Sequence, residues 1–278
     1  NGKLLKEKIF KNIWIQPAAG DAGGSLGAAL AFWYLELEKD RENINIDSMQ
    51  GSYLGPEYSQ DNIENELKKL GAKFDVLNNE DLIERTAKSL SKGAAIGWFQ
   101  GRMEFGPRAL GSRSILGDAR SATMQKNLNL KVKYRESFRP FAPSVLREDL
   151  ENWFDLDTDS PYMTFVADIN PKIKNKMTED QEKLFGIDKL NVKRSEIPAV
   201  THIDYSARVQ TVSKSYNEKF YNLIKEFYRI TDVPVLVNTS FNLNGQPIVC
   251  DPTDAIKTFF SCGLDILAIG DYVVMKDD

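Results

Sequence analysis

Cysteine and histidine are almost missing from this chain of 278 residues, which has two cysteines and one histidine. Cys250 and Cys262 are too few for a disulfide framework, and their scarcity fits a reducing compartment, so we expect a cytoplasmic protein. We interpret both cysteines as core residues. The single histidine, His202, excludes a His-rich metal centre within this chain and is interpreted as a structural hydrogen-bonding residue rather than a general base.

Long hydrophobic runs are also lacking. No apolar stretch reaches about 18 residues, so the sequence predicts no membrane-spanning helix. The opening Asn1-Gly2-Lys3 and the charged residues after it do not have the pattern of a signal peptide. The 42% of hydrophobic and 27% of charged residues are typical of a globular protein, and the length allows one large domain or two modest ones.

The chain as a whole lacks an excess of positive charge, but one segment has such an excess. The net charge of −4 argues against a broad nucleic-acid-binding surface, which needs an excess of basic residues. From Arg102 to Arg139, however, nine basic residues stand against three acidic ones, which leaves this segment at +6. Such a local reversal of sign predicts a site for a small anion rather than for a polyanion.

The order of apolar and polar segments predicts an α/β fold, or an α+β fold with a mixed sheet. We expect Asp61, Asp81 and Asp251 to start helices, and residues 170–196 to form a polar insertion. The expected elements are a strand at 13–15, a glycine turn and helix at 17–34, a loop at 35–52, helices at 60–70, 80–92, 215–230 and 251–260, strands at 94–99, 141–146, 201–212 and 233–238, and a hairpin at 266–269 and 272–275.

Three arginines lie among glycines directly after the expected strand at 94–99, in the sequence Gly101-Arg-Met-Glu-Phe-Gly-Pro-Arg-Ala-Leu-Gly-Ser-Arg-Ser114. Arginine presents a planar fork of donors that matches pairs of phosphate or carboxylate oxygens. Glycine lets backbone N–H groups approach the same ligand. The alternative is a solvated loop with surface arginines, but such loops seldom contain so many conformationally special residues.

A second basic segment follows at Lys131-Val-Lys-Tyr-Arg135. If this segment is extended, its alternating cations lie on one side. We expect Phe138 and Phe141 to pack so that they hold Arg139 rigid. The alternative is an edge strand whose charges prevent aggregation.

Neutral polar residues end the expected strand at 233–238. Asn238, Thr239, Ser240 and Asn242 would stand at its carboxyl end, where open α/β sheets commonly bind ligands, although the same residues also suit an ordinary turn. Arg208 is a further candidate for binding an oxyanion.

Together these segments resemble the successive signatures of one family, the NodU/CmcH-type carbamoyltransferases. The resemblance covers nearly the whole chain and is weakest near residues 170–196. The matching stretches are Gly106-Pro-Arg-Ala-Leu-Gly-Ser-Arg-Ser114, Arg135-Glu-Ser-Phe-Arg-Pro-Phe-Ala-Pro143, Arg208-Val-Gln-Thr-Val212 and Asn238-Thr-Ser-Phe-Asn242, with 17–29 and Tyr53-Leu-Gly-Pro56 further upstream.

The resemblance implies two parts. Residues 1–74 would end a TsaD-like domain of the actin/Hsp70 ATPase class, and residues 75–278 would form a YrdC-like domain, with the boundary between 72 and 82. In the family, the first domain holds a divalent metal, with iron as a candidate, through two histidines and aspartates. Asp21 is similar to one aspartate ligand, but the paired histidines are not in this sequence, so we expect a fragment of a longer protein.

The resemblance also implies a reaction. The YrdC-like domain would convert carbamoyl phosphate and ATP to carbamoyl adenylate, and the carbamoyl group would pass to an acceptor hydroxyl, of a sugar or of an antibiotic. Mg²⁺ would accompany ATP, held mostly by phosphates and water. We expect catalytic roles for Arg108, Lys133 and Arg135. Substrate or nucleotide binding is expected of Arg102, Glu104, Arg113, Arg139, Arg208, Asn238, Ser240 and Asn242.

Two other functions stay open at this point. One is a YrdC-like module that binds a nucleotide or an RNA end without catalysis, which the acidic balance of the chain disfavours. The other is a structural remnant that folds but binds neither ATP nor carbamoyl phosphate. No membrane and no nucleic acid are expected as partners, and a homodimer is left open.

Overall fold

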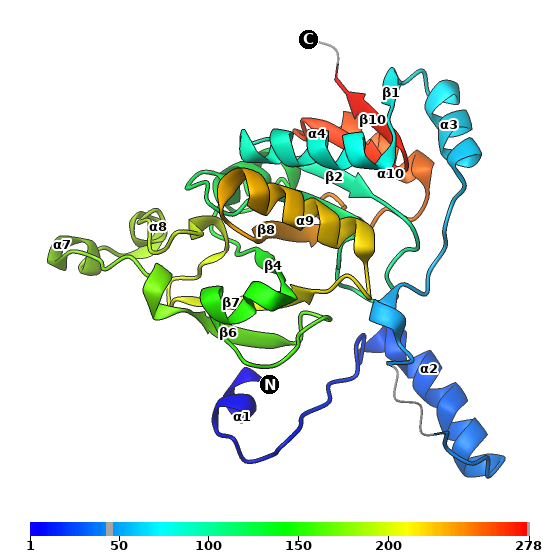
Figure 1. Cartoon of the computed structure of the whole chain (residues 1–278), viewed down its shortest axis with the longest axis horizontal. Coiled ribbons are helices and arrows are strands. Elements are labelled where there is room, and N and C mark those ends of the chain that lie inside the picture. Colours follow the sequence, from blue (N-terminus) through cyan, green and yellow to red (C-terminus); the bar gives the residue numbers. More distant parts are fainter. Residues whose placement is uncertain (43–46, 277–278) are drawn as a thin grey trace.

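The computed structural model describes residues 1–42 and 47–276. The strands of this described part form one mixed sheet in the order β1-β10-β9-β2-β3-β8-β4-β7-β6-β5 (Figure 1). Their bounds are β1 Phe74–Val76, β2 Ile96–Phe99, β3 Arg113–Asp118, β4 Ala142–Leu146, β5 Phe154–Asp155, β6 Phe165–Ile169, β7 Ser206–Val212, β8 Val235–Ser240, β9 Ile266–Ile269 and β10 Tyr272–Met275. The pairs β2–β9 and β4–β7 are parallel, and the other neighbours are antiparallel.

The helices of the described part range from single turns to fourteen residues. The α-helices are α1 Gly2–Lys6, α2 Asp21–Ala31, α3 Gln60–Lys69, α4 Asn79–Ser91, α5 Met124–Asn127, α6 Leu150–Trp153, α7 Glu179–Glu182, α8 Gly186–Leu190, α9 Glu218–Thr231 and α10 Pro252–Phe260. Shorter turns are π-helical at Phe32–Glu36 and Leu128–Val132, and 3-10 helical at Gln50–Ser52, Arg147–Asp149, Pro171–Ile173 and Pro198–Val200.

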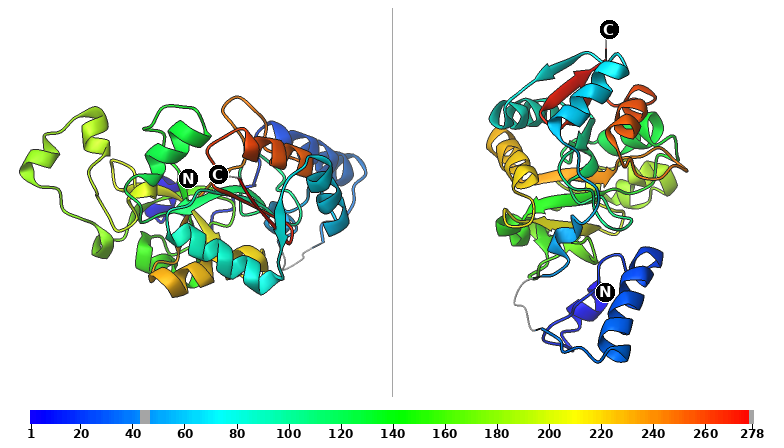
Figure 2. Two further views of the ribbon diagram at one scale, coloured as in Figure 1. Left: turned by 90° about the horizontal axis from the view of Figure 1, so that it is seen from above. Right: turned by 90° about the vertical axis from the view of Figure 1, so that its right-hand side faces the viewer.

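Helices cover both faces of the sheet. Because side chains alternate along each strand, one strand contributes residues to the cores on both faces. On β2, Ile96 and Trp98 belong to the core cluster that includes α4 and α9, whereas Phe99 belongs to the cluster that includes α3 and α10. Figure 2 shows these two layers of helices on opposite sides of the strands. Strands β2, β3, β4 and β9 are therefore buried at every position, as expected of strands covered on both faces.

The amino-terminal segment stands apart from this layered body. Helix α2 buries none of its residues and projects away from the sheet (Figure 1). The π-helical turn after it leaves Phe32, Trp33 and Leu35 exposed. Among the described residues, no helix combines the length and the apolar character that crossing a bilayer would require.

The structure confirms the predicted α/β class with a mixed sheet and the terminal hairpin at its predicted bounds, and the predicted helices are present with slightly shifted ends. The predicted strand at 13–15 was wrong, since those residues have no regular structure. Asp61 and Asp81 are not the capping residues of their helices: the side chains of Ser59 and Asn78 accept the capping bonds, from the N–H groups of Asn62 and Asp81.

The proposed division of the chain between residues 74 and 75 falls at the start of β1, where Phe74 pairs with Val274 of β10. The two residues on either side of this division therefore lie at the edge of the same sheet. The division stays a prediction.

A single core substitution tests the layered arrangement. Leu223 on α9 is fully buried between α4, α9 and the sheet, so Leu223→Ala should lower the free energy of unfolding by about 2–4 kcal/mol. The exposed Lys225 on the same helix gives a matched control, and Lys225→Ala should change stability by less than about 0.5 kcal/mol. Urea unfolding of both variants checks this, and equal effects would contradict the arrangement.

Candidate functional site

A cavity of about 300 Å³ lies at the ends of three neighbouring inner strands, where β8 ends and β4 and β7 begin. β8 runs antiparallel to β4, and β4 runs parallel to β7, so the carboxyl end of one strand meets the amino ends of the other two. The loop between β2 and β3 and the segment before β4 complete the wall. Its polar lining consists of Arg108, Arg135, Arg139, Arg208, Asn238, Thr239 and Ser240.

Four guanidinium groups thus line one cavity, and no carboxylate belongs to its described lining. Burial, and then the neighbouring Arg108, lower the pKa of Arg208 on β7 to about 10. The same pair of causes, burial followed by the charge of Arg139, lowers the pKa of Arg135. Glu136 at the rim offsets part of the repulsion at Arg135, but the described lining itself supplies no negative charge, which favours occupation by an anion.

Arg135 and Arg139 have different supports. The Nε of Arg135 donates to Oδ1 of Asn129 at 2.7 Å, and its guanidinium lies 5.1 Å from the ring centre of Phe141. Arg139 is exposed at the rim, where its Nε donates to Glu136 at 2.9 Å. Arg135 is therefore held in place by its neighbours, whereas Arg139 can exchange its surface partner for a ligand.

The backbone next to Arg108 is fixed from inside the sheet. Nδ2 of Asn238 donates to the carbonyl of Ala109 at 3.2 Å, and Nε2 of Gln210 donates to the carbonyl of Leu110 at 2.7 Å. The buried Glu104 accepts the N–H of Leu110 at 2.7 Å. These hydrogen bonds hold the backbone that follows Arg108, whereas the Arg108 side chain is exposed and lines the cavity.

Asn238 takes part in a buried network that the sequence did not reveal. Its Nδ2 also donates to Ser144 on β4 at 3.0 Å and to Gln210 on β7 at 2.9 Å, and the hydroxyl of Ser144 donates to Gln210 at 2.5 Å. These bonds tie three neighbouring strands together at the cavity wall. Oδ1 of Asn238 is buried and has no hydrogen-bond partner. An unsatisfied buried acceptor of this kind is unfavourable.

Lys133 does not line the cavity but lies behind it. Its Nζ donates to the carbonyl and the hydroxyl of Ser240, and to the carbonyl and Oδ1 of Asn242. Asn242 donates its own Nδ2 to the carbonyl of Gln246 at 2.7 Å. Lys133 and Asn242 therefore fix the end of β8, and Ser240 is the member of this group that reaches the cavity.

Three further residues predicted to bind substrate lie outside the cavity. Arg113 is fully buried, 3.6 Å from the ring centre of Phe99, and its Nη1 donates to three backbone carbonyls. Glu104 accepts the N–H groups of Leu110, Ser112 and Arg113. Arg102 is exposed and lies 3.5 Å from a carboxylate oxygen of Glu57. Arg113 and Glu104 thus support the loop through their backbone bonds, although Nε of Arg113 has no hydrogen-bond partner, and their expected binding roles stay predictions.

The second basic segment is not extended, so the expected row of cations was wrong. Residues Leu128–Val132 form a π-helical turn, after which Lys133 is buried. Phe138 is exposed and does not hold Arg139, whereas Phe141 is buried under Arg135 as a packing residue. The alternation of Lys131, Lys133 and Arg135 did not distinguish an extended segment from the end of a helical turn.

The residues considered for metal or acid–base chemistry lie elsewhere. Asp21 is exposed at the start of α2, and the described residues contain no cluster of three or more His, Cys, Asp or Glu that could hold a metal. Asp21 alone therefore does not make a metal centre. His202 Nδ1 lies 3.4 Å from the hydroxyl of Ser206. Cys262 is buried as predicted, but Cys250 is exposed, so its interpretation as a core residue was wrong.

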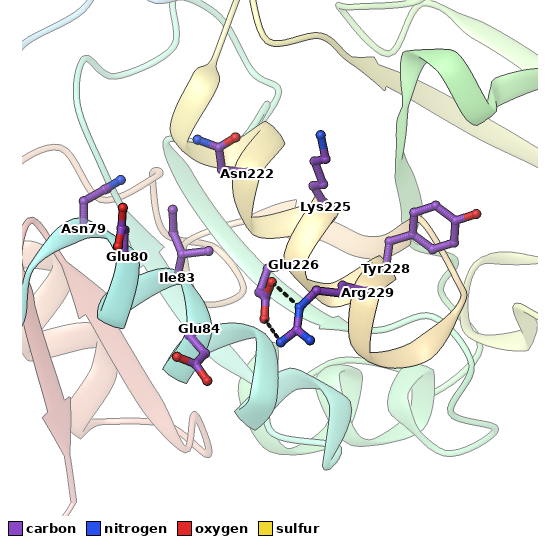
Figure 3. A pocket seen from close by; sticks show the side chains of 9 residues that line it. All are labelled: Asn79, Glu80, Ile83, Glu84, Asn222, Lys225, Glu226, Tyr228 and Arg229. Atoms are coloured by element: carbon purple, nitrogen blue, oxygen red, sulfur yellow. Dashed lines mark hydrogen bonds and ion pairs between the residues drawn. The ribbon is translucent and has the colours of Figure 1, made fainter.

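A larger hollow of about 690 Å³ lies between α4 and α9. Figure 3 shows its side chains, among them Glu226 and Arg229, which form an ion pair on α9 with 2.6 Å between Nη2 and Oε1. Acidic and basic side chains both line this groove. It has neither the single sign of charge nor the sequence motifs of the arginine cavity, so the smaller cavity is the candidate site.

Comparison with known proteins agrees with the motifs that line the cavity. The family described as Carbamoyltransferase C-terminus matches residues 87–276, and the family described as Carbamoyltransferase N-terminus matches residues 1–30. The first match covers more than half of the chain. The chain therefore belongs to the carbamoyltransferase family, which confirms the resemblance seen in its sequence.

Several relatives are similar over 99% of this chain. They include the uncharacterized protein sll1178 of Synechocystis (54% identical), the nodulation protein NolNO of Sinorhizobium fredii (41%) and the nodulation protein NolO of Bradyrhizobium diazoefficiens (40%). The chain spans 45%, 38% and 47% of their respective lengths. The crystal structure of full-length HypF in the phosphate- and nucleotide-bound form has 15% identity and a TM-score of 0.45, over 82% of this chain and 28% of HypF, a similarity too distant to bear on function.

The environment of Lys133 gives a pH-dependent prediction. Burial, and then the charge of Arg135, lower the pKa of Lys133 from 10.5 to about 7. Between these two values the unfolded chain binds more protons than the folded protein, so stability should rise with pH. The difference in free energy of unfolding between the wild type and Lys133→Met should therefore grow in favour of the wild type, by at most about 1.4 kcal/mol per pH unit. Urea unfolding from about pH 7 to pH 9 measures it, and a difference independent of pH would contradict the lowered pKa.

Proposed function

We propose that the arginine cavity binds carbamoyl phosphate together with the phosphates of ATP, and that the protein is an O-carbamoyltransferase. In this proposal the residues from 75 onward act as a YrdC-like domain that forms carbamoyl adenylate. The observation that carries it is the gathering of Arg108, Arg135, Arg139 and Arg208 around one small cavity without a carboxylate in its described lining. Family membership supports carbamoyl transfer as the type of reaction.

The proposed chemistry makes an arginine cavity useful. Carbamoyl phosphate is a dianion at neutral pH, and ATP brings a triphosphate to the same place. Carbamoyl phosphate, ATP and one water would give carbamoyl adenylate, phosphate and pyrophosphate, and the acceptor hydroxyl would then displace AMP. The reacting groups repel one another, so the largest catalytic contribution is expected from donors fixed before the substrates arrive. The guanidinium of Arg135, held by Asn129 and Phe141, fits that requirement.

The neutral end of the cavity suits the carbamoyl group. A carbamoyl NH₂ is a donor, and the unpartnered Oδ1 of Asn238 is an acceptor in the residue that lines the cavity wall. The hydroxyl of Ser240 is fixed by Lys133 and Asn242 and lies on the same wall. We assign these two residues to orientation of the carbamoyl group, and the arginines to the phosphates.

Metal ions enter this proposal in two different ways. Mg²⁺ would arrive with ATP and neutralise part of its charge, held by phosphate oxygens and water because the described cavity lining offers no carboxylate. A divalent metal of a TsaD-like domain would need ligands beyond Asp21, so we assign no step to it. The acceptor, a sugar or an antibiotic hydroxyl, would be selected outside this cavity. The scarcity of cysteine supports a reducing compartment such as the cytoplasm.

Removal of a cavity arginine tests the assignment. In the intact protein, Arg108→Ala or Arg135→Ala should lower kcat/KM for pyrophosphate release from ATP in the presence of carbamoyl phosphate by about 100-fold or more, because each change removes a fixed charged donor. Arg229→Ala is the matched control: this arginine is paired with a surface carboxylate but lies on α9, outside the cavity, so its loss should leave kcat/KM within about threefold of the wild type. Unchanged release in both cavity variants would defeat the proposal.

A substrate analogue tests the carbamoyl end separately. Acetyl phosphate replaces the NH₂ of carbamoyl phosphate by a methyl group of similar size, so it cannot donate to Oδ1 of Asn238. The wild-type protein should prefer carbamoyl phosphate over acetyl phosphate by at least about tenfold in kcat/KM, measured as pyrophosphate release. Equal use of the two compounds would leave the phosphate assignment standing and remove the role given to Asn238.

A further inference from the structure

The loop that carries Arg108 is also held from outside the sheet, by a segment that we call the strap, residues 47–57. The strap crosses the loop of residues 100–112 and bonds to it through the backbone. The N–H of Phe105 donates to the carbonyl of Ser52 at 2.6 Å, and the N–H of Gly55 donates to Met103 at 2.9 Å. The N–H of Met103 donates in turn to the carbonyl of Pro56 at 2.9 Å. These three backbone hydrogen bonds join the strap to a loop that is not itself part of a β-strand.

Tyr53 makes the contact nearest to the cavity. Its hydroxyl donates to the carbonyl of Leu110 at 2.8 Å, two residues after Arg108. The carbonyl oxygen of Leu110 also accepts a hydrogen bond from Nε2 of Gln210 at 2.7 Å, so both lone pairs of this carbonyl are used. Burial, and then Glu104, raise the pKa of Tyr53, so its hydroxyl stays protonated and able to donate. Gln210 holds Leu110 from the sheet, whereas Tyr53 holds it from residues that precede β1.

The opposite end of the strap is fixed to another part of the cavity wall. The carboxylate of Asp47 accepts the hydroxyls of Tyr162 and Tyr216, and the N–H of Gly51 donates to the Tyr162 hydroxyl at 3.2 Å. Tyr162 directly precedes Met163, which lines the cavity. One segment thus contacts two separate portions of the wall.

The strap needs these contacts to keep its shape. Gln50, Gly51 and Ser52 follow one another in the left-handed region, with φ of 49°, 70° and 67°. Glycine adopts this conformation readily, but for Gln50 and Ser52 it is unfavourable. The turn therefore persists because its partners impose it.

A second amino-terminal contact lies nearby: a Cβ at Gly106 would come within 2.5 Å of the Cβ of Ala18, so a side chain there would push the two segments apart.

We propose that Tyr53 is a positioning residue of the arginine cavity, which fixes the backbone of Arg108 through Leu110 and so sets the affinity for carbamoyl phosphate. This inference rests on the proposed function of the cavity. Tyr53 does not line the cavity, so its effect is on the placement of Arg108. The strap is then the route by which residues before β1 act on the cavity.

The test compares Tyr53→Phe with Tyr272→Phe in the intact protein. Tyr272 on β10 offers a matched control, because its hydroxyl donates to the carbonyl of Gln60 at 3.3 Å, far from the cavity in strand order. Tyr53→Phe should raise KM for carbamoyl phosphate by about fivefold, the effect of one lost hydrogen bond, with kcat within about twofold of the wild type. A merely structural role would lower Tm and the active fraction, and hence apparent kcat, without a change in KM.

Hydrogen–deuterium exchange of residues 100–112 gives a second readout that needs no turnover. The N–H groups of Phe105 and Leu110 should exchange at least about threefold faster in Tyr53→Phe than in the wild type and in Tyr272→Phe. If KM for carbamoyl phosphate is the same in both variants, the positioning role is overturned. If the wild type itself releases no pyrophosphate, the proposed function fails, and unchanged exchange in Tyr53→Phe then overturns the strap as a support of the loop.

Discussion

Repulsion among guanidinium groups is the constraint around which the cavity is built. Arg108 approaches Arg208, and Arg135 approaches Arg139, without a carboxylate in the described lining, and the strands behind the cavity form a largely uncharged scaffold. The network of Asn238, Ser144 and Gln210 supplies this scaffold with amide and hydroxyl groups that add no charge. A carboxylate in their place would neutralise the cavity and compete with an anionic ligand. The scaffold thus keeps the positive charge available.

Much of this arrangement could be predicted from the sequence, because the arginines stand in long motifs that follow buried strands. Six of the residues expected to act, among them Arg108, Arg208 and Asn238, lie on the wall of one cavity. Their chemical roles remain predictions. The class of fold followed from the order of apolar segments, since the strands are buried on both faces and their flanking helices carry clear apolar stripes.

The rest could not be predicted, because a charged side chain in a glycine-rich loop can face a ligand or its own backbone. Arg113 and Glu104 belong to the same motif as Arg108 but turn inward and satisfy the loop. Arg113, for example, turns toward the carbonyl of Pro56, more than 40 residues earlier in the chain. Lys133 and Gln210 are similar cases, whose partners are distant in sequence.

The strand order has a consequence for how the protein responds to its ligand. Arg108, in the loop before β3, and Arg208, on β7, are about one hundred residues apart in the sequence. They approach each other only in the folded sheet, where β8 and β4 join β3 to β7. A partly folded chain without this central arrangement has no cavity, so an anion that occupied the cavity would bind the native state alone. Such a ligand shifts the folding equilibrium by mass action. In a cell with ample substrate, occupancy and resistance to unfolding would therefore rise and fall together.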